Sequence, residues 1–200
     1  MQDIDEDEEL FSVGLSDVLS VENSNLPRHI PEAFTELDSW MSLILVMIYE
    51  EGQKEKSTWW PYFNIFPDDF DTLMQWSPSE LAELQGSAVV KKIGKSEANT
   101  SFLEQLLPIV KGQHALFGDY ATVFASSNGE ARFLMIAHRM ATLIMAYAFD
   151  FEPEQEDEDW QDDTSEIPSL PKAMVPLADL LNADGDKNNV SNTETCESPY

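Results

Sequence analysis

The sequence predicts an α+β fold in which a small β part is interrupted by a mostly helical insertion. The 200 residues are 42% hydrophobic and 10% aromatic, which is enough to build a core. Short apolar segments stand near both ends of the chain, and apolar residues at helical spacing fill the middle. Since the chain starts and stops inside the β part, we expect a domain that is cut short at both ends.

The first β segment is expected at residues 9–21, where apolar positions alternate loosely. We assign residues 1–24 to the N-terminal part of the β core. Residues 22–38 hold turn formers followed by Pro27 and Pro31, so they are expected to form a loop that leads into a helix.

The helical insertion is expected to span residues 25–151. The stretch 37–51 is apolar almost all round and predicts a helix that is buried on most sides. In the stretch 76–87, Ser77 is a candidate N-cap and Glu80 follows it at the N3 position, which is close to a capping box.

Two longer helical stretches complete the insertion. Apolar residues at helical spacing run through 96–118, where Pro108 predicts an interruption or a kink. Residues 128–151 contain no Pro or Gly after Gly129, and we expect the longest and best-packed helix there.

The composition changes abruptly after the helical block. Residues 152–172 are acidic and poor in aliphatic side chains, which predicts a linker or a disordered loop. Residues 173–190 are expected to return to the β core, beginning with a strand or loop that passes into a short helix within 173–184. The polar tail 191–200 is expected to be disordered.

The formal net charge of −27 bears on the choice of partners. Such a surface repels a nucleic-acid backbone and attracts basic proteins, although acidity that serves only solubility is an equal alternative. The N-terminus is acidic where a targeting peptide is basic, and no apolar run is long enough to span a bilayer. We therefore expect a soluble intracellular protein with a basic protein partner and no direct contact with nucleic acid or membrane.

Metal and nucleophile chemistry finds little support in the sequence. The single cysteine excludes a disulfide framework and a Cys-rich zinc cluster, and the three histidines are scattered. Asn182, Asp184 and Asp186 resemble the first ligands of an EF-hand, but Lys187 and Thr193 replace the required Gly and Glu. A G-x-S-x-G elbow, a P-loop and a dinucleotide-binding glycine run are absent from the sequence. We expect no metal site.

The residues WWPYF (59–63) form an aromatic cluster directly after the first long helical stretch. Such clusters commonly pack into a core. The functional alternative is an aromatic wall for a lysine side chain, because the apolar stem and cationic tip of lysine suit an aromatic face. Both interpretations of Trp59 stay open.

Four segments carry a resemblance to a known family. They are DEDEELFSV with SDVLSVENS (5–24), STWWPYFNIFP (57–67), HRMATLIMAYAFDFEP (138–153) and MVPLADLLNAD (174–184). In order, they resemble the strands after a glycine motif, a W-x-P-Y segment, the helix that returns from an insertion, and a P-x-A-D-x-x-N-H segment. This combination resembles the SET-domain protein-lysine methyltransferases with an inserted helical subdomain. That class includes the Rubisco large-subunit methyltransferase and the fungal ribosomal lysine N-methyltransferases.

The resemblance implies an incomplete SET β-core interrupted by a mostly α-helical insertion. It also implies transfer of methyl groups from S-adenosylmethionine to lysines of a basic ribosomal or nuclear protein, and residence in the nucleus, with the cytoplasm as an alternative. The positions implied to contact the cofactor are Tyr147, Asn182 and Ala183, the last standing where the family has His. The positions implied to contact the substrate are Trp59, Ala148 and Asp150.

The family's glycine-rich motif and active-site Tyr have no counterpart in this sequence. We therefore assign no catalytic residue and expect the chain alone to be weak or inactive. The main alternative is a non-enzymatic acidic helical module that binds a basic protein. An unstable fragment is the third interpretation.

Overall fold

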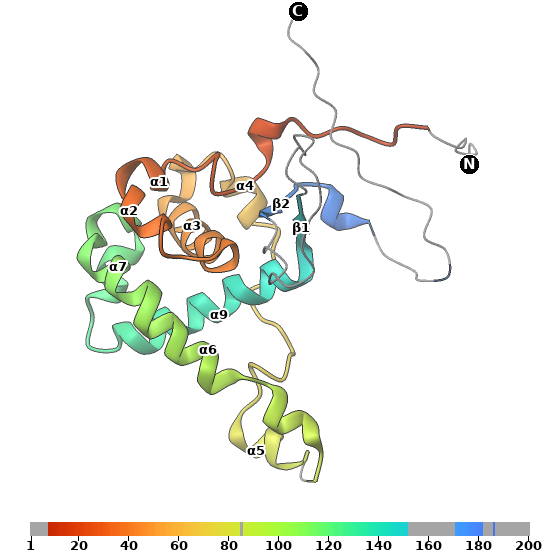
Figure 1. The fold of residues 1–200 in the computed structure, drawn as a ribbon, viewed down its shortest axis with the longest axis vertical. Helices are drawn as coiled ribbons and strands as arrows, with labels where there is room; N and C mark the ends of the chain where they lie inside the picture. The colour runs from red at the N-terminus through yellow and green to blue at the C-terminus, as the bar shows by residue number, and fades with distance from the viewer. Residues whose placement is uncertain (1–7, 85, 152–170, 182–185, 187–200) are drawn as a thin grey trace, which may run out of the picture.

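The computed structural model describes residues 8–84, 86–151, 171–181 and 186. They form a mostly helical body with one two-stranded sheet, which is compatible with the predicted α+β class. In Figure 1, α3 lies in the upper body and α9 runs below it. The strands β1 and β2 lie at one end of α9, and the part that carries α5 projects at the bottom of the view.

The segment 9–21 contains no regular strand, so the prediction of one or two strands there is wrong. Leu15–Asp17 form a 3₁₀ turn, and Leu19 alone forms an isolated antiparallel bridge with Met174. Leu10, Phe11 and Leu15, which lie upstream of Leu19, are exposed. Because a strand needs pairing along its length and one buried face, the loose alternation is not enough to form one.

Two short helices occupy the segment in which we predicted a loop leading into a helix. α1 (Leu26–His29) carries Pro27 in its first turn, and α2 (Pro31–Phe34) begins with Pro31. Proline suits the first turn of a helix, since the N–H there has no intrahelical partner. The side chain of Leu26 is fully buried, so this segment contributes to the core.

α3 (Ser39–Gln53) is the central buried helix, as its apolar sequence predicts. Asp38 caps its start by accepting a hydrogen bond from the Met41 N–H at 2.7 Å. Every residue from Met41 to Glu50 is buried. Burial on all sides explains why this stretch lacks a polar face.

α9 (Gly129–Tyr147) packs along α3 and is the longest helix among the described residues, as predicted. Its end differs from the prediction, because the helix stops at Tyr147 and Ala148–Asp150 form the strand β1. This strand pairs antiparallel with β2 (Lys172–Met174), at a place where we predicted a strand or a loop. Pairing with a distant segment therefore overrides the helical pattern of the sequence at this end.

The helical stretch 96–118 is interrupted, as predicted from Pro108. α6 (Lys95–Ser101) passes through a π-helical turn (Phe102–Leu106) into α7 (Leu107–Gly112). Proline lacks the N–H that would bond four residues back, and the wider turn before it accommodates that loss. A 3₁₀ turn (His114–Phe117) and α8 (Tyr120–Phe124) then lead to α9.

The remaining elements are short. α4 (Trp60–Phe63) follows α3, after a 3₁₀ turn at Lys54–Lys56. α5 (Pro78–Ala82) begins with the predicted capping box, in which Ser77 and Glu80 satisfy each other's backbone N–H groups. A 3₁₀ turn at Ala178–Leu180 follows β2, in keeping with the predicted passage into a short helix.

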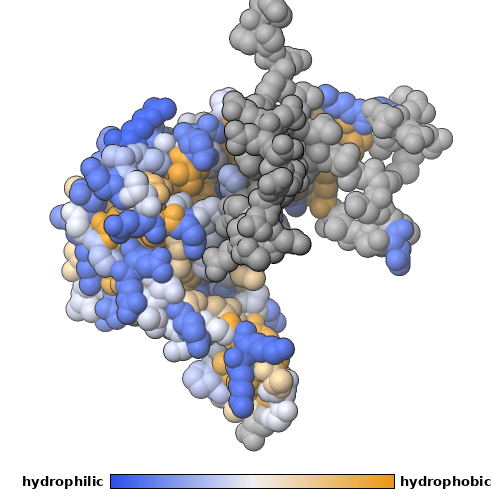
Figure 2. Space-filling model, viewed as in Figure 1, coloured by the Kyte–Doolittle hydropathy of each residue, from blue (hydrophilic) through white to orange (hydrophobic). Residues whose placement is uncertain are grey.

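Figure 2 shows a surface that is largely hydrophilic over the helical body, with apolar residues gathered on the projecting part that carries α5. There, the 3₁₀ turn Ala88–Lys92 exposes Val89 and Val90. None of the described helices combines the length and hydrophobicity that a membrane span needs.

Candidate functional site

The four segments that carry the family resemblance meet at the end of α9 where β1 and β2 lie (Figure 1). Leu19 and Met174 exchange backbone hydrogen bonds at 3.0 and 2.9 Å. The Trp59 indole N–H donates to the Asp17 carbonyl at 2.9 Å. These contacts bring distant parts of the sequence into one place, which we name the β1–β2 corner (residues 17–19, 59–66, 147–150 and 172–181).

Trp59 is 8% exposed and therefore packs as a core residue. It also lines an open groove of about 330 Å³ beside α4. Much of the groove wall is apolar and comes from Pro61, Ile65, Pro176, Leu177 and Leu180. The structure thus places Trp59 in the core and at the wall of a groove at the same time.

Tyr62 and Asp179 form the central polar contact of the corner. The buried Tyr62 hydroxyl donates to Asp179 Oδ2 at 2.7 Å. Burial and the neighbouring carboxylate both raise the pKa of Tyr62, so the phenol keeps its proton at neutral pH. Asp179 Oδ1 is also buried and has no hydrogen-bond partner among the described residues. An oxygen in this condition is suited to accept a hydrogen bond from a ligand.

An aromatic row joins Tyr62 to the end of α9. The rings of Tyr62 and Phe66 lie 4.4 Å apart between centroids, and Phe66 stacks on Tyr147 at 6.0 Å with an interplanar angle of 18°. Tyr147, predicted to be on the cofactor side, is half-buried. The W-x-P-Y segment and the end of the long helix are therefore packed against each other through Phe66.

The predicted substrate-side residues of β1 are engaged in the sheet. Ala148 is half-buried and pairs with Met174, and the Asp150 carboxylate forms an ion pair with Lys172 on the paired strand. The predicted cofactor residues Asn182 and Ala183 lie outside the described residues.

The turn that leads to residue 182 has an unusual backbone. Leu177 has φ +74° and ψ −37°, a region that residues with a side chain rarely adopt. Its side chain is 59% exposed, so packing alone does not hold it there. Strain of this kind persists only where neighbouring structure fixes the chain, and it concentrates at functional sites.

Sequence reasoning missed Tyr62 and Asp179 as site residues. Each was part of a quoted segment, as the Tyr of W-x-P-Y and the Asp of P-x-A-D. Their patterns were a usable signal, because a polar side chain within an otherwise apolar segment needs a partner when it is buried. The pairing itself joins positions 117 residues apart, and one sequence does not reveal it.

No metal cluster is found in the part of the chain that the structure describes, where no three His, Cys, Asp or Glu side chains gather as ligands. Among the EF-hand-like positions, Asn182 and Asp184 lie outside the described residues. His29 and His114 are exposed, and His138 contacts the Asn99 side chain at 2.5 Å.

No protein-family model matches the chain. Curated relatives do match it. The chain is 36% identical to ribosomal lysine N-methyltransferase 4 of Saccharomyces cerevisiae over 205 residues, which cover 96% of this chain and 40% of that protein. It is 30% identical to N-lysine methyltransferase setd6 of Xenopus laevis, covering 90% of this chain and 38% of that protein. The human N-lysine methyltransferase SETD6 is also 30% identical, over 75% of this chain. The chain spans about two fifths of the length of the first two relatives.

Proposed function

Because this chain belongs to the SET-domain protein-lysine methyltransferases, we propose that it transfers methyl groups from S-adenosylmethionine to lysine side chains of a basic ribosomal or nuclear protein. The observation that carries the proposal is the meeting of the four resembling segments in the β1–β2 corner. Function has to be argued from a site, and this corner is built from all four. On the resemblance alone, we propose the nucleus as the compartment.

The proposal includes a domain organisation. Residues 1–24 and 173–190 belong to a SET β-core, 25–151 form the helical insertion, 152–172 link the two, and 191–200 form a tail. The pairing of Leu19 and β1 with β2 supports it, because these contacts join the proposed core segments to the end of the insertion.

The described residues of the corner offer the kinds of chemical group that can bind S-adenosylmethionine. Tyr147 offers a half-buried aromatic face, and Asp179 Oδ1 is a buried acceptor that suits a hydroxyl or ammonium group. We propose that Asn182 and the backbone of Ala183 hold the cofactor as well. When bound, S-adenosylmethionine supplies a methyl group that its sulfonium charge makes electrophilic.

The groove beside Trp59 suits the lysine side chain of a substrate. Its apolar wall gives a four-carbon stem a surface to pack on. Apolar surroundings lower the pKa of a lysine amine, which favours the neutral form that attacks the methyl group. We propose that Ala148 and Asp150 border the entry to this site, where Asp150 exchanges Lys172 for a cationic group of the substrate.

The charge of the chain favours the same class of substrate. A net charge of −27 attracts a basic protein over distance and raises the rate of encounter. This attraction weakens as salt is added, because mobile ions screen charges that lie in solvent. Binding of the substrate should therefore depend on ionic strength.

Calorimetric titration of the 200-residue chain with S-adenosylmethionine tests the proposal first. Saturable binding is expected, and Asn182→Ala should weaken it. Asn128→Ala is the matched control, since the Asn128 side chain makes no capping hydrogen bond at the start of α9. A folded chain that shows no binding would contradict the proposal. Transfer of labelled methyl groups to a purified mixture of ribosomal proteins then tests the reaction.

The acidity of the chain also favours a second candidate, a non-enzymatic module that binds a basic protein. The two functions differ in their need for the cofactor site. Retention of a basic ribosomal protein without S-adenosylmethionine, unaffected by Tyr147→Ala, together with no methyl transfer, would favour the second candidate.

A further inference from the structure

We propose that Tyr62 is a positioning residue for the cofactor site. Its hydroxyl holds the Asp179 side chain, and through it the turn 176–181, in the conformation that presents Asp179 Oδ1 to the cofactor site. The inference rests on the proposed function, because it concerns the segment that the proposal assigns to the cofactor. The effect of Tyr62 on the conformation of the turn can be measured without any ligand.

The contact between the two side chains is the first observation. Tyr62 is 6% exposed, and its hydroxyl lies 2.7 Å from Asp179 Oδ2. The other carboxylate oxygen is buried without a partner among the described residues. Tyr62 therefore supplies the one hydrogen bond that these residues give to the Asp179 side chain. Removal of the hydroxyl would leave a desolvated carboxylate with no donor from the described chain.

The backbone of the turn is the second observation. Leu177 lies at positive φ. Two backbone hydrogen bonds close the turn after it, both at 3.1 Å. The Leu180 N–H donates to the Leu177 carbonyl, and the Leu181 N–H donates to the Ala178 carbonyl. These bonds are internal to the turn, so they do not fasten it to the rest of the molecule. A turn with a residue at positive φ relaxes unless something outside it fixes the chain.

Few other contacts are available to fasten this turn. The side chains of Leu177 and Leu180 are 59% and 66% exposed, and only Ala178 is buried. Tyr62, by contrast, is fixed on α4 by its ring contact with Phe66. The hydrogen bond therefore links α4 to a turn that has few other contacts with the rest of the described molecule.

A second tyrosine, which is half-buried, provides a matched control. Tyr120 of α8 also donates its hydroxyl to a carboxylate, that of Glu51 on α3. This pair lies outside the residues that form the β1–β2 corner. Tyr62→Phe and Tyr120→Phe each remove one hydroxyl that donates to a carboxylate, and only the first should affect the turn.

Hydrogen exchange of the 200-residue chain, followed by mass spectrometry without ligand, tests the claim about the turn. Tyr62→Phe should speed exchange of the amides of 177–181 about tenfold or more, with exchange of α9 unchanged. Tyr120→Phe should leave exchange of 177–181 as in the wild type. Asp179→Ala should speed exchange of the turn like Tyr62→Phe, which keeps the test open if Tyr62→Phe folds poorly.

Calorimetry with S-adenosylmethionine tests the link to the cofactor. The dissociation constant should rise about tenfold in Tyr62→Phe and stay within about twofold of the wild type in Tyr120→Phe. In an Asp179→Ala background, Tyr62→Phe should have no further effect, because Tyr62 acts through Asp179.

The outcomes separate the two proposals. Unchanged exchange of 177–181 in both Tyr62→Phe and Asp179→Ala overturns the inference. Faster exchange with unaltered cofactor affinity also overturns it, since the turn would then not position the site. A wild-type chain that binds no S-adenosylmethionine contradicts the proposed function, and the exchange data then decide by themselves whether Tyr62 holds the turn.

Discussion

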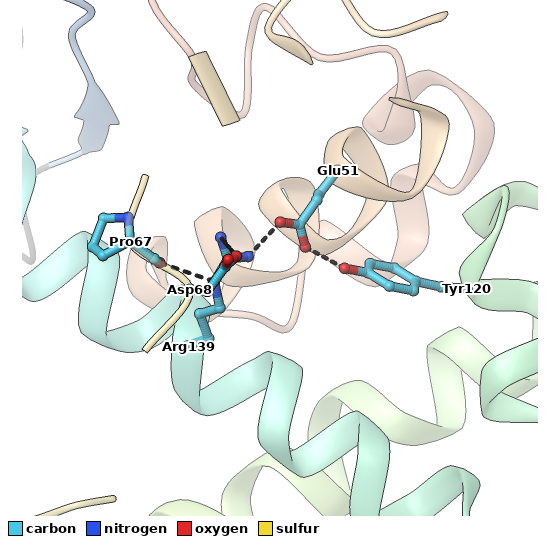
Figure 3. A network of polar contacts seen from close by, with 5 residues as sticks. All are labelled: Glu51, Pro67, Asp68, Tyr120 and Arg139. Atoms are coloured by element: carbon cyan, nitrogen blue, oxygen red, sulfur yellow. Dashed lines mark hydrogen bonds and ion pairs between the residues drawn. The ribbon is translucent and has the colours of Figure 1, made fainter. Parts of the chain in front are cut away.

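Arg139 of α9 and Glu51 of α3 form an ion pair that is largely withdrawn from water (Figure 3). Their side chains are 18% and 12% exposed. The Tyr120 hydroxyl donates to the second Glu51 oxygen, and Arg139 Nε donates to the Pro67 carbonyl at 3.3 Å. One guanidinium thus ties the two longest described helices to the loop after α4.

Replacement of Arg139 should destabilise the fold strongly. Arg139→Met is expected to lower the free energy of unfolding by about 2–4 kcal/mol, because it leaves the Glu51 carboxylate buried without its cation. Urea denaturation measures the change. Lys54→Met is the control, since Lys54 and Asp119 form an exposed pair whose loss should cost less than about 1 kcal/mol. Equal losses in the two variants would contradict the role of burial.

The close approach of Gly52 and Gly118 gives a second prediction, which compares the effects of two glycine substitutions on stability. A Cβ at Gly118, which has φ +53°, would lie 2.1 Å from the Gly52 carbonyl oxygen. Gly118→Ala should therefore lower the midpoint of thermal unfolding by several degrees, because backbone atoms would have to move. Gly112→Ala in α7 meets nothing within 4 Å and should leave stability unchanged or raise it by about 0.5–1 kcal/mol. The reverse order would contradict the close packing of the two chain segments.

The buried carboxylate of Glu50, near the end of α3, gives a third prediction. Ser24 and Ser57 donate their hydroxyls to the two oxygens of Glu50 at 2.7 and 2.6 Å. Glu50→Gln turns one acceptor into a donor and should lower the free energy of unfolding by about 1–3 kcal/mol. Chemical denaturation checks this value. Glu55→Gln, at an exposed position, should change stability by less than about 0.5 kcal/mol.

Acid should weaken the contact between α9 and α6 through His138. Burial and then the nearby Lys95 charge lower the pKa of His138, whose ring also meets Phe102 edge-on. The unfolded chain binds a proton near pH 6.5, and the folded chain binds it only at lower pH. The contribution of neutral His138 to the free energy of unfolding is therefore complete above about pH 7. It declines as the pH falls from about 6.5 toward the lower pKa of the folded chain.

Urea midpoints between pH 7.5 and 5 measure this effect. His138→Gln should reduce the decline, whereas His29→Gln, at an exposed position, should leave it as in the wild type. An identical pH dependence in the wild type and His138→Gln would contradict the assignment.

The helices and the capping box were predictable because their causes are local. The run 41–50 is buried on all sides and is apolar apart from Ser42 and Glu50, and Ser77 with Glu80 forms its capping box within one turn. The end of α9 was not predictable from local sequence. The helix stops there because residues 148–150 pair with β2, a strand at residues 172–174 that is distant in the sequence.

Some residues of the candidate site could likewise be predicted from local sequence, and others could not. Trp59 and Tyr147 stood out as residues of motif-like segments, and the structure places both in the β1–β2 corner. The link between Tyr62 and Asp179 depends on how α4 and the turn after β2 pack against each other. That packing is a property of the folded molecule, and no local pattern encodes it.

Leu19, Tyr62 and Met174 of the β1–β2 corner are buried in the same apolar core as α3 and α9. The turn 177–181 differs from the rest of the corner, because Leu177, Leu180 and Leu181 are exposed. This turn can therefore open locally while the two helices stay packed. Variants selected only for a normal melting temperature would include molecules in which the helices are intact and the turn is not, and local exchange measures the state of the turn directly.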